Sequence, residues 1–119
     1  MPTRIRFRRT KGYRLPEGAI YVGRPTKFGN PFPIPGYGLE QSLTLFWNSA
    51  HGIWDPAVVS LHIDLVPAYE AHQKFLKRLG GHPVEVARAE LGGHDLACWC
   101  APEARCHADI WLAIANAPP

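Results

Sequence analysis

The stretch that most constrains the fold lies near residue 100, where a short strand pattern passes directly into a helical one. The apolar run Leu96 to Trp99 is typical of a strand, Ala101-Pro102 breaks it, and helical periodicity begins at Cys106. A strand followed at once by a helix is a unit of α/β proteins, in which ligands bind at the carboxyl ends of strands. All three cysteines of the chain lie here: Cys98, Cys100 and Cys106, with His107 beside the last. We therefore expect the working centre of the protein at this turn.

Short strand and helix patterns fill most of the remaining chain. Strands are predicted at Arg4–Arg8, where basic and apolar residues alternate, at Ala19–Val22, and at residues 95–100. Helices are predicted at residues 39–50, 67–79, 83–91 and 106–116. Residues 23–38 are too rich in glycine and proline for regular structure, and residues 51–66 fit neither pattern. The prediction is a Rossmann-like α/β fold that forms one small single domain over residues 1–119, with a short sheet of about three or more strands flanked by helices.

Positive charge is concentrated at one end of the chain. Residues 1–30 hold eight lysines and arginines against one glutamate, whereas the whole chain carries a net charge of only +3. This favours an anionic partner, either a nucleotide-like small molecule or nucleic acid. No apolar run has the length of a membrane span and the N-terminal residues lack the pattern of a secretory signal, so we expect no membrane partner and a cytoplasmic location. In a reducing compartment, an odd number of clustered cysteines indicates metal binding or catalysis rather than disulfides.

The cysteine-rich turn allows three interpretations. In the first, Cys106 or Cys100 is an activated nucleophile at the start of a helix, and His107 or His94 is its base. Asp109, in the first turn of that helix, supports the helix dipole or orients the site. In the second, a structural zinc ion is held by Cys98, Cys100, Cys106 and His107, although their spacing matches no common zinc motif. In the third, the cysteines are small core residues. Only the second interpretation requires a cofactor.

Residues 21–32, Tyr-Val-Gly-Arg-Pro-Thr-Lys-Phe-Gly-Asn-Pro-Phe, have the composition of a ligand-binding loop. The glycines allow backbone amides to approach a ligand, the basic residues can neutralise phosphate, Phe28 can stack on a base and Asn30 can bond to a base edge. The spacing matches neither a Walker loop nor a dinucleotide fingerprint, so a surface loop with an aromatic anchor is the alternative. The candidate ligand-binding residues are Gly23, Arg24, Lys27, Phe28, Gly29 and Asn30.

Two further predictions concern side-chain placement. Arg4, Arg6 and Arg8 would form a row on one face of the first strand. That row either binds phosphate or, as the simpler interpretation, is the protective charge of an edge strand. The core is expected to contain Trp47, Trp54 and Trp111.

These motifs together resemble a known family. The 21–32 loop, paired with Asp95-Leu-Ala-Cys-Trp-Cys-Ala-Pro102 and Cys106-His-Ala-Asp109, is similar to the domain of unknown function 4326, a family of small bacterial and bacteriophage proteins. The resemblance extends over essentially the whole chain and implies that the loop and the cysteine turn form one site. The chain departs from the family pattern in a longer spacer before Cys106 and in Phe28, where tryptophan is common. The resemblance supplies no activity.

The functional prediction is a small enzyme or binding domain for a nucleotide-like, phosphorylated ligand. The loop would hold the ligand, and the cysteine turn would support transfer or hydrolysis at a glycosidic or phosphate-linked carbon. One alternative is a non-enzymatic nucleic-acid-binding module, with or without zinc. Another is a phage or host interaction protein whose cysteines are structural.

Overall fold

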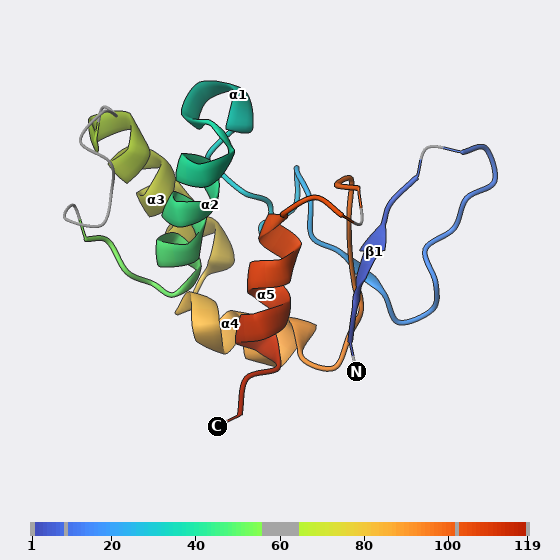
Figure 1. Cartoon of the computed structure of the whole chain (residues 1–119). Helices are drawn as coiled ribbons and strands as arrows, with labels where there is room; N and C mark the ends of the chain where they lie inside the picture. The colour runs from blue at the N-terminus through green and yellow to red at the C-terminus, as the bar shows by residue number, and fades with distance from the viewer. Residues whose placement is uncertain (1, 9, 56–64, 102, 119) are drawn as a thin grey trace.

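A short parallel sheet lies beside a group of helices (Figure 1). The protein is described from a computed structural model that places residues 2–8, 10–55, 65–101 and 103–118. The strands are β1 (Arg4–Arg6), β2 (Ile20–Tyr21) and β3 (Leu96–Cys98), in the spatial order β1-β3-β2. Both outer strands run parallel to β3, with Leu96 opposite Arg4 on one side and Ile20 on the other. The strand that comes last in the sequence is therefore the central one.

The described residues form five helices beside this sheet. They are α1 (Ile34–Tyr37), α2 (Leu39–Ala50), α3 (Leu65–Leu79), α4 (Pro83–Leu91) and α5 (His107–Ala115). Helix α5 is placed between the sheet and α2 (Figure 1), and it contacts β1, β3, α2 and α4. No described helix combines the length and apolar character needed to cross a membrane.

Local sequence signals set several helix ends. Pro83 occupies the first turn of α4, and the His82 ring accepts a hydrogen bond from the backbone amide of Val84. Gly80 follows α3 with a φ of 76°, a left-handed conformation that glycine adopts without strain. Cys106 is the N-cap of α5, and Asp109 places a carboxylate in the first turn, where it complements the helix dipole.

The α/β prediction is confirmed, and the four predicted helices begin and end within two residues of their expected bounds. The strands are shorter than predicted at one or both ends. Helix α1 lies in the segment predicted to be irregular. It could not be predicted, because its four residues include a proline and a glycine and carry no helical periodicity. Of the ambiguous stretch 51–66, residues 56–64 lie outside the described residues, and Leu65 and Val66 belong to α3.

The hydrophobic core is centred on Trp111 of α5, which is fully buried. Its ring packs against Phe28, Phe46 and Phe75 at centroid distances of 5.4, 5.4 and 6.0 Å. The indole N–H donates a hydrogen bond to the backbone oxygen of Phe28, at 2.8 Å. This one side chain therefore joins the 21–32 loop to α2 and α3.

Of the three tryptophans expected in the core, Trp47 lies outside it and Trp54 is only partly buried. Trp47 is 49% exposed and packs on the His51 ring, so its core assignment is wrong. Neighbouring positions on a helix point about 100° apart, and Phe46 rather than Trp47 faces the core. Trp54 is half-buried at the margin of the core, where it stacks on His72.

Buried His72 should make the stability of the fold depend on pH. Its ring is 3% exposed, and its Nδ1 lies 2.9 Å from the Ser49 hydroxyl. Burial lowers the pKa of His72, so below pH 6.5 the unfolded chain binds more protons than the folded one. We expect the free energy of unfolding to fall as the pH drops below 6.5 and towards the lowered pKa, by at most about 1.4 kcal/mol per pH unit for this group.

Urea titrations at several pH values would measure this dependence. The His72→Gln variant, which cannot gain a proton, should show a shallower slope than the parent protein between about pH 7 and pH 5. Equal slopes would mean that His72 binds as many protons in the folded state as in the unfolded state, so that its pKa is not lowered.

Candidate functional site

The carboxyl ends of β2 and β3 open onto a common pocket. Because the two strands are parallel neighbours, the segments that follow Tyr21 and Cys98 leave the same edge of the sheet. These segments, together with parts of α1 and α2, line a pocket of about 380 Å³. The predicted site residues that line it are Gly23, Arg24, Asn30, Cys100, Cys106 and His107. The loop and the cysteine turn therefore border one cavity.

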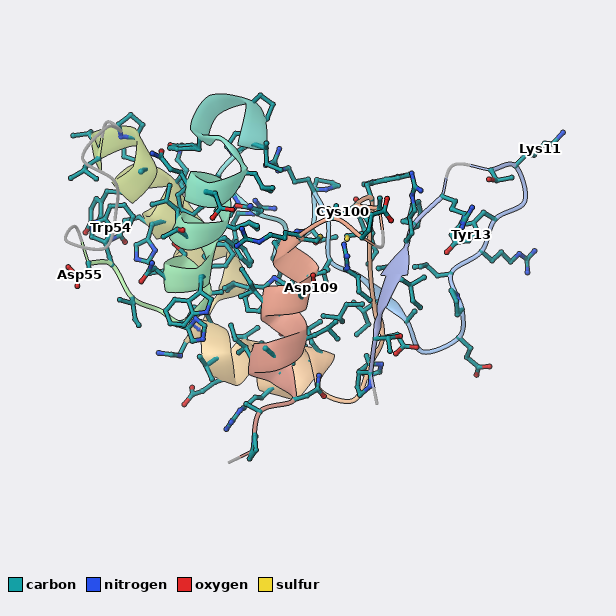
Figure 2. All side chains as sticks on the ribbon, viewed as in Figure 1. Lys11, Tyr13, Trp54, Asp55, Cys100 and Asp109 are labelled. Atoms are coloured by element: carbon teal, nitrogen blue, oxygen red, sulfur yellow. The ribbon has the colours of Figure 1, made fainter. Side chains whose placement is uncertain are left out.

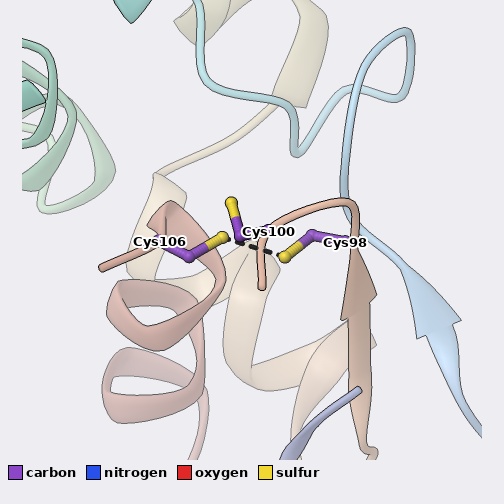
Figure 3. Close-up of side chains that lie close together, drawn as sticks. All are labelled: Cys98, Cys100 and Cys106. Atoms are coloured by element: carbon purple, nitrogen blue, oxygen red, sulfur yellow. Dashed lines mark hydrogen bonds between the residues drawn. The ribbon is translucent and has the colours of Figure 1, made fainter. Parts of the chain in front are cut away.

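The sulfur atoms of the three cysteines converge beside this pocket (Figure 3). Strand β3 supplies Cys98, the following turn supplies Cys100, and the N-cap of α5 supplies Cys106. The three Sγ atoms lie within 4.8 Å of one another, and those of Cys98 and Cys106 are 2.9 Å apart. All three are free thiols; Cys98 and Cys106 are buried and Cys100 is half-buried. Such a cluster could hold a metal ion.

Hydrogen bonding within the cluster favours one thiolate. Hydrogen bonds with Cys100 and then Cys106 lower the pKa of Cys98, and the Arg4 guanidinium adds to this effect. The pKa of Cys106 is raised, because its thiol is hydrogen-bonded to Cys100 and Cys98 and is buried. We therefore assign the negative charge to Cys98 and the retained proton to Cys106.

Arg4 is the counter-ion of this site, which differs from the outward row of arginines predicted for β1. Its side chain is only 10% exposed, with Nε 3.2 Å from Asp109 Oδ1, and it donates a 2.7 Å hydrogen bond to the Ala104 oxygen. Figure 2 shows Asp109 at the start of α5, on the side that faces β1. Arg6, in the edge strand β1, and Arg8, two residues beyond it, are exposed, as the simpler interpretation of the row requires. Asp109 thus acts on the cysteines through Arg4 and does not line the pocket.

His107 is held as a neutral imidazole between the loop and the cysteines. Its Nε2 lies 2.8 Å from the Val22 carbonyl oxygen, so the proton belongs on Nε2. Burial lowers the pKa of His107, which keeps Nδ1 unprotonated. That nitrogen lies 3.6 Å from Cys106 Sγ and is the available acceptor for the thiol proton. Among the described residues, the group compatible with a metal ion contains the three cysteines without His107.

The loop places Arg24 at the pocket by close backbone packing. Arg24 is exposed and donates through Nε to the Asn30 backbone oxygen at 2.8 Å. A Cβ atom on Gly29 would meet the Arg24 backbone at 3.1 Å, and one on Gly23 would meet the Tyr21 hydroxyl oxygen at 2.4 Å. A larger residue at either position would therefore force a neighbouring group to shift. Arg24 also lines the pocket.

Three of the expected ligand-binding residues make contacts within the protein. Phe28, predicted to stack on a base, is 5% exposed and packs edge-to-face on Trp111. Lys27 forms a 2.8 Å ion pair with Glu90 of α4 and does not line the pocket. The Asn30 side chain is buried, where it bonds to protein groups rather than to the cavity. An irregular loop has no periodicity from which these directions could be predicted.

Sequence reasoning missed four residues of the site. Arg4 stands at the cysteines, while the pocket is also lined by Tyr21, Trp99 and Arg105, the last of which is paired with Glu40. The available signal was the alternation of strands, which sets Arg4 and Ile5 on opposite faces of β1. It could not identify the neighbouring strand, because pairing across the sheet is not encoded locally.

Comparison with known proteins assigns the chain to a family. The model of the family described as Domain of unknown function (DUF4326) matches residues 5–117, and the chain belongs to this family. No curated protein and no solved structure matched the chain.

Proposed function

We propose that this domain binds a nucleotide-like, phosphorylated ligand in the pocket at the carboxyl edge of the sheet. The observation that carries the proposal is that cationic, aromatic and thiol side chains line the same cavity: Arg24 and Arg105, Tyr21 and Trp99, and the cysteine cluster. A volume of about 380 Å³ lies within the range of small-molecule sites.

Each part of the ligand has a matching group. Arg24 offers a planar fork suited to phosphate oxygens, and the first turn of α5 presents backbone amides and a positive dipole end beside the cysteines. Tyr21 and Trp99 offer aromatic surface for a base or sugar. These groups lie around the thiols, so the cysteine cluster would face a bound ligand.

The pairing of Cys106 with His107 suits transfer or hydrolysis at a glycosidic or phosphate-linked carbon. Cys106 keeps its proton in the free protein, and would pass it to Nδ1 of His107 only as the sulfur forms a bond to that carbon. The leaving group would depart with the bonding electron pair and take the proton from His107. Water, or an acceptor hydroxyl that loses its proton to His107, would then displace the sulfur and complete hydrolysis or transfer.

Removal of the Arg24 side chain tests the pocket. Arg24→Ala should weaken the binding of AMP, ADP or ATP by about 10- to 150-fold, the value of a charge-assisted hydrogen bond, as measured by titration calorimetry. Lys27→Ala is the matched control, because Lys27 pairs with Glu90 away from the pocket, and it should leave affinity unchanged. Circular dichroism would check that both variants are folded. Equal affinities for Arg24→Ala and the parent protein would remove the pocket assignment.

A zinc ion on the three sulfurs is the second candidate for the chemistry of this site. Three converging thiols provide soft ligands, and with His107 outside the group a fourth position would be left for a ligand from the pocket. Tetrahedral zinc with Zn–S bonds of about 2.3 Å needs sulfurs about 3.8 Å apart. Binding would therefore require the 2.9 Å separation of Cys98 and Cys106 to widen by about 1 Å.

Metal analysis separates the two forms of the site. With zinc, we expect about one ion per chain in protein purified without chelator, and thiols that react with a disulfide reagent only after chelation. Cys100→Ser removes one of the three thiol ligands and should abolish zinc binding. A metal-free protein with an immediately reactive thiol would instead support the nucleophile.

A further inference from the structure

The sheet face that points away from α5 carries a cluster of four aromatic rings. Ala97 of β3 pairs with Ile5 of β1 and with Tyr21 of β2. These residues lie on the face of the sheet opposite to the one where Arg4 and Cys98 meet α5. The rings on this side belong to Phe7, Tyr13, Tyr21 and Trp99, and we call their surface the aromatic face. Phe7 is central, with ring centroids 4.6 Å from Trp99, 5.0 Å from Tyr21 and 5.5 Å from Tyr13. Trp99 is 40% exposed, which leaves part of its ring accessible.

Exposed cations accompany these rings along the same segment. The exposed lysine and arginine side chains of β1 and of the loop that follows it are Arg6, Arg8, Lys11 and Arg14. Figure 2 shows Lys11 and Tyr13 on a loop that projects from the sheet away from the helices. Within the described part of the chain, the ion pairs involve Arg4, Lys27 and Arg105, so none of the four exposed cations is neutralised by a carboxylate. Exposed cations and aromatic rings therefore occur along one segment of the chain, and strand alternation directs Arg6 to the side of β1 opposite Phe7.

We propose that the aromatic face and its four cations form a binding surface for single-stranded nucleic acid. Flat rings with accessible faces stack on unpaired bases, and arginine and lysine side chains follow the phosphate backbone. Charge complementarity identifies the occupant as a polyanion, and the exposed Trp99 identifies it as one that carries flat bases. Base pairing hides those faces, so a duplex would use the cations alone. The surface borders the proposed nucleotide pocket, because Tyr21 and Trp99 contribute to both.

Fluorescence anisotropy with a labelled thymidine dodecamer would measure this binding. If all four cations contact phosphates, the affinity should fall with salt at a logarithmic slope of about −3, or about 50-fold between 50 and 200 mM KCl. A duplex of the same length should bind more weakly at every salt concentration.

Two variants separate the rings from the charges. Trp99→Ala should lower affinity for the dodecamer by about 5- to 150-fold with little change of the salt slope. The double change Arg6→Gln and Arg8→Gln removes exposed charges without disturbing packing, and it should reduce the slope to about half. The matched controls are Trp47→Ala, a similarly exposed tryptophan on α2, and the double change Lys74→Gln and Lys77→Gln on α3. Both controls should bind as the parent protein does.

The outcomes that would overturn the proposal are distinct. One is the absence of binding at 50 mM KCl by protein whose circular dichroism shows it to be folded. A second is equal affinity for the duplex, or for vesicles of anionic phospholipid, which would indicate a general polyanion or membrane surface. A third is full affinity in both the Trp99 and the arginine variants. Because the probe is an oligonucleotide and Arg24 is untouched, failure of mononucleotide binding in the pocket does not decide this experiment.

Discussion

Replacing Trp111 with alanine should lower the free energy of unfolding by about 4 kcal/mol, a large part of the stability of a small domain. The indole is fully buried among Phe28, Phe46 and Phe75, so its removal leaves a cavity that the surrounding rings cannot fill. It also removes the donor that satisfies the Phe28 carbonyl oxygen. Urea denaturation followed by far-ultraviolet circular dichroism would measure the loss.

Two further variants serve as controls for this prediction. Trp111→Phe keeps an aromatic ring in the core but loses the N–H donor, so it should lower the free energy of unfolding by less than Trp111→Ala does. This variant can still be measured if the alanine variant does not fold. Trp47→Ala removes a half-exposed ring from α2 and should change stability by no more than about 0.5 kcal/mol. Similar losses for Trp47→Ala and Trp111→Ala would place the centre of the core elsewhere.

The second large effect is expected from Asn30→Ala, at about 2–3 kcal/mol. The Asn30 side chain is buried, accepts a hydrogen bond from the Phe32 amide at 2.8 Å and donates one to the Ser42 hydroxyl at 2.9 Å. Alanine would leave the Phe32 amide without its acceptor in a place that water does not reach. Because the Asn30 backbone oxygen accepts from Arg24, the variant should also weaken nucleotide binding.

Asn116→Ala is the matched control for burial. The Asn116 side chain also makes two hydrogen bonds, to the Gly93 amide and the Leu112 oxygen, each at 2.9 Å, but it is exposed. Water can replace those partners, so the loss should stay below about 1 kcal/mol in the same urea titration. Losses of equal size for the two variants would show that burial does not set the cost.

Helices were the most predictable part of this fold. The proline that begins α4 and the glycine after α3 are local signals, and they placed those ends correctly. The strands are too short for alternation to define their ends. Each outer strand pairs with β3 over only two or three positions, and that pairing depends on residues far away in the sequence. The Trp47 assignment failed because the buried stripe of α2 includes Leu45 and Phe46, and Trp47 is the next position around the helix, outside that stripe.

The candidate site was predictable as a neighbourhood but not as a set of side-chain directions. Strand ends in an α/β fold meet at one edge, which is why Arg24 and Cys100 could be expected near one another. Whether Phe28 turns inward or outward depends on Trp111, which lies 83 residues further along the chain. The inward position of Arg4 likewise depends on Asp109 of a distant helix. No local pattern encodes such contacts.

The central position of β3 affects how the chain assembles during its synthesis. β1 and β2 both precede Val22, yet neither pairs with the other, so each must wait for Leu96–Cys98 to be inserted between them. At ribosomal rates of about 5–20 residues per second, the segment in between takes on the order of ten seconds to make. Throughout that interval the arginine-rich first strand has no sheet to join, and it is open to whatever anions the nascent chain encounters. The sheet is therefore a late product, completed by its own middle strand.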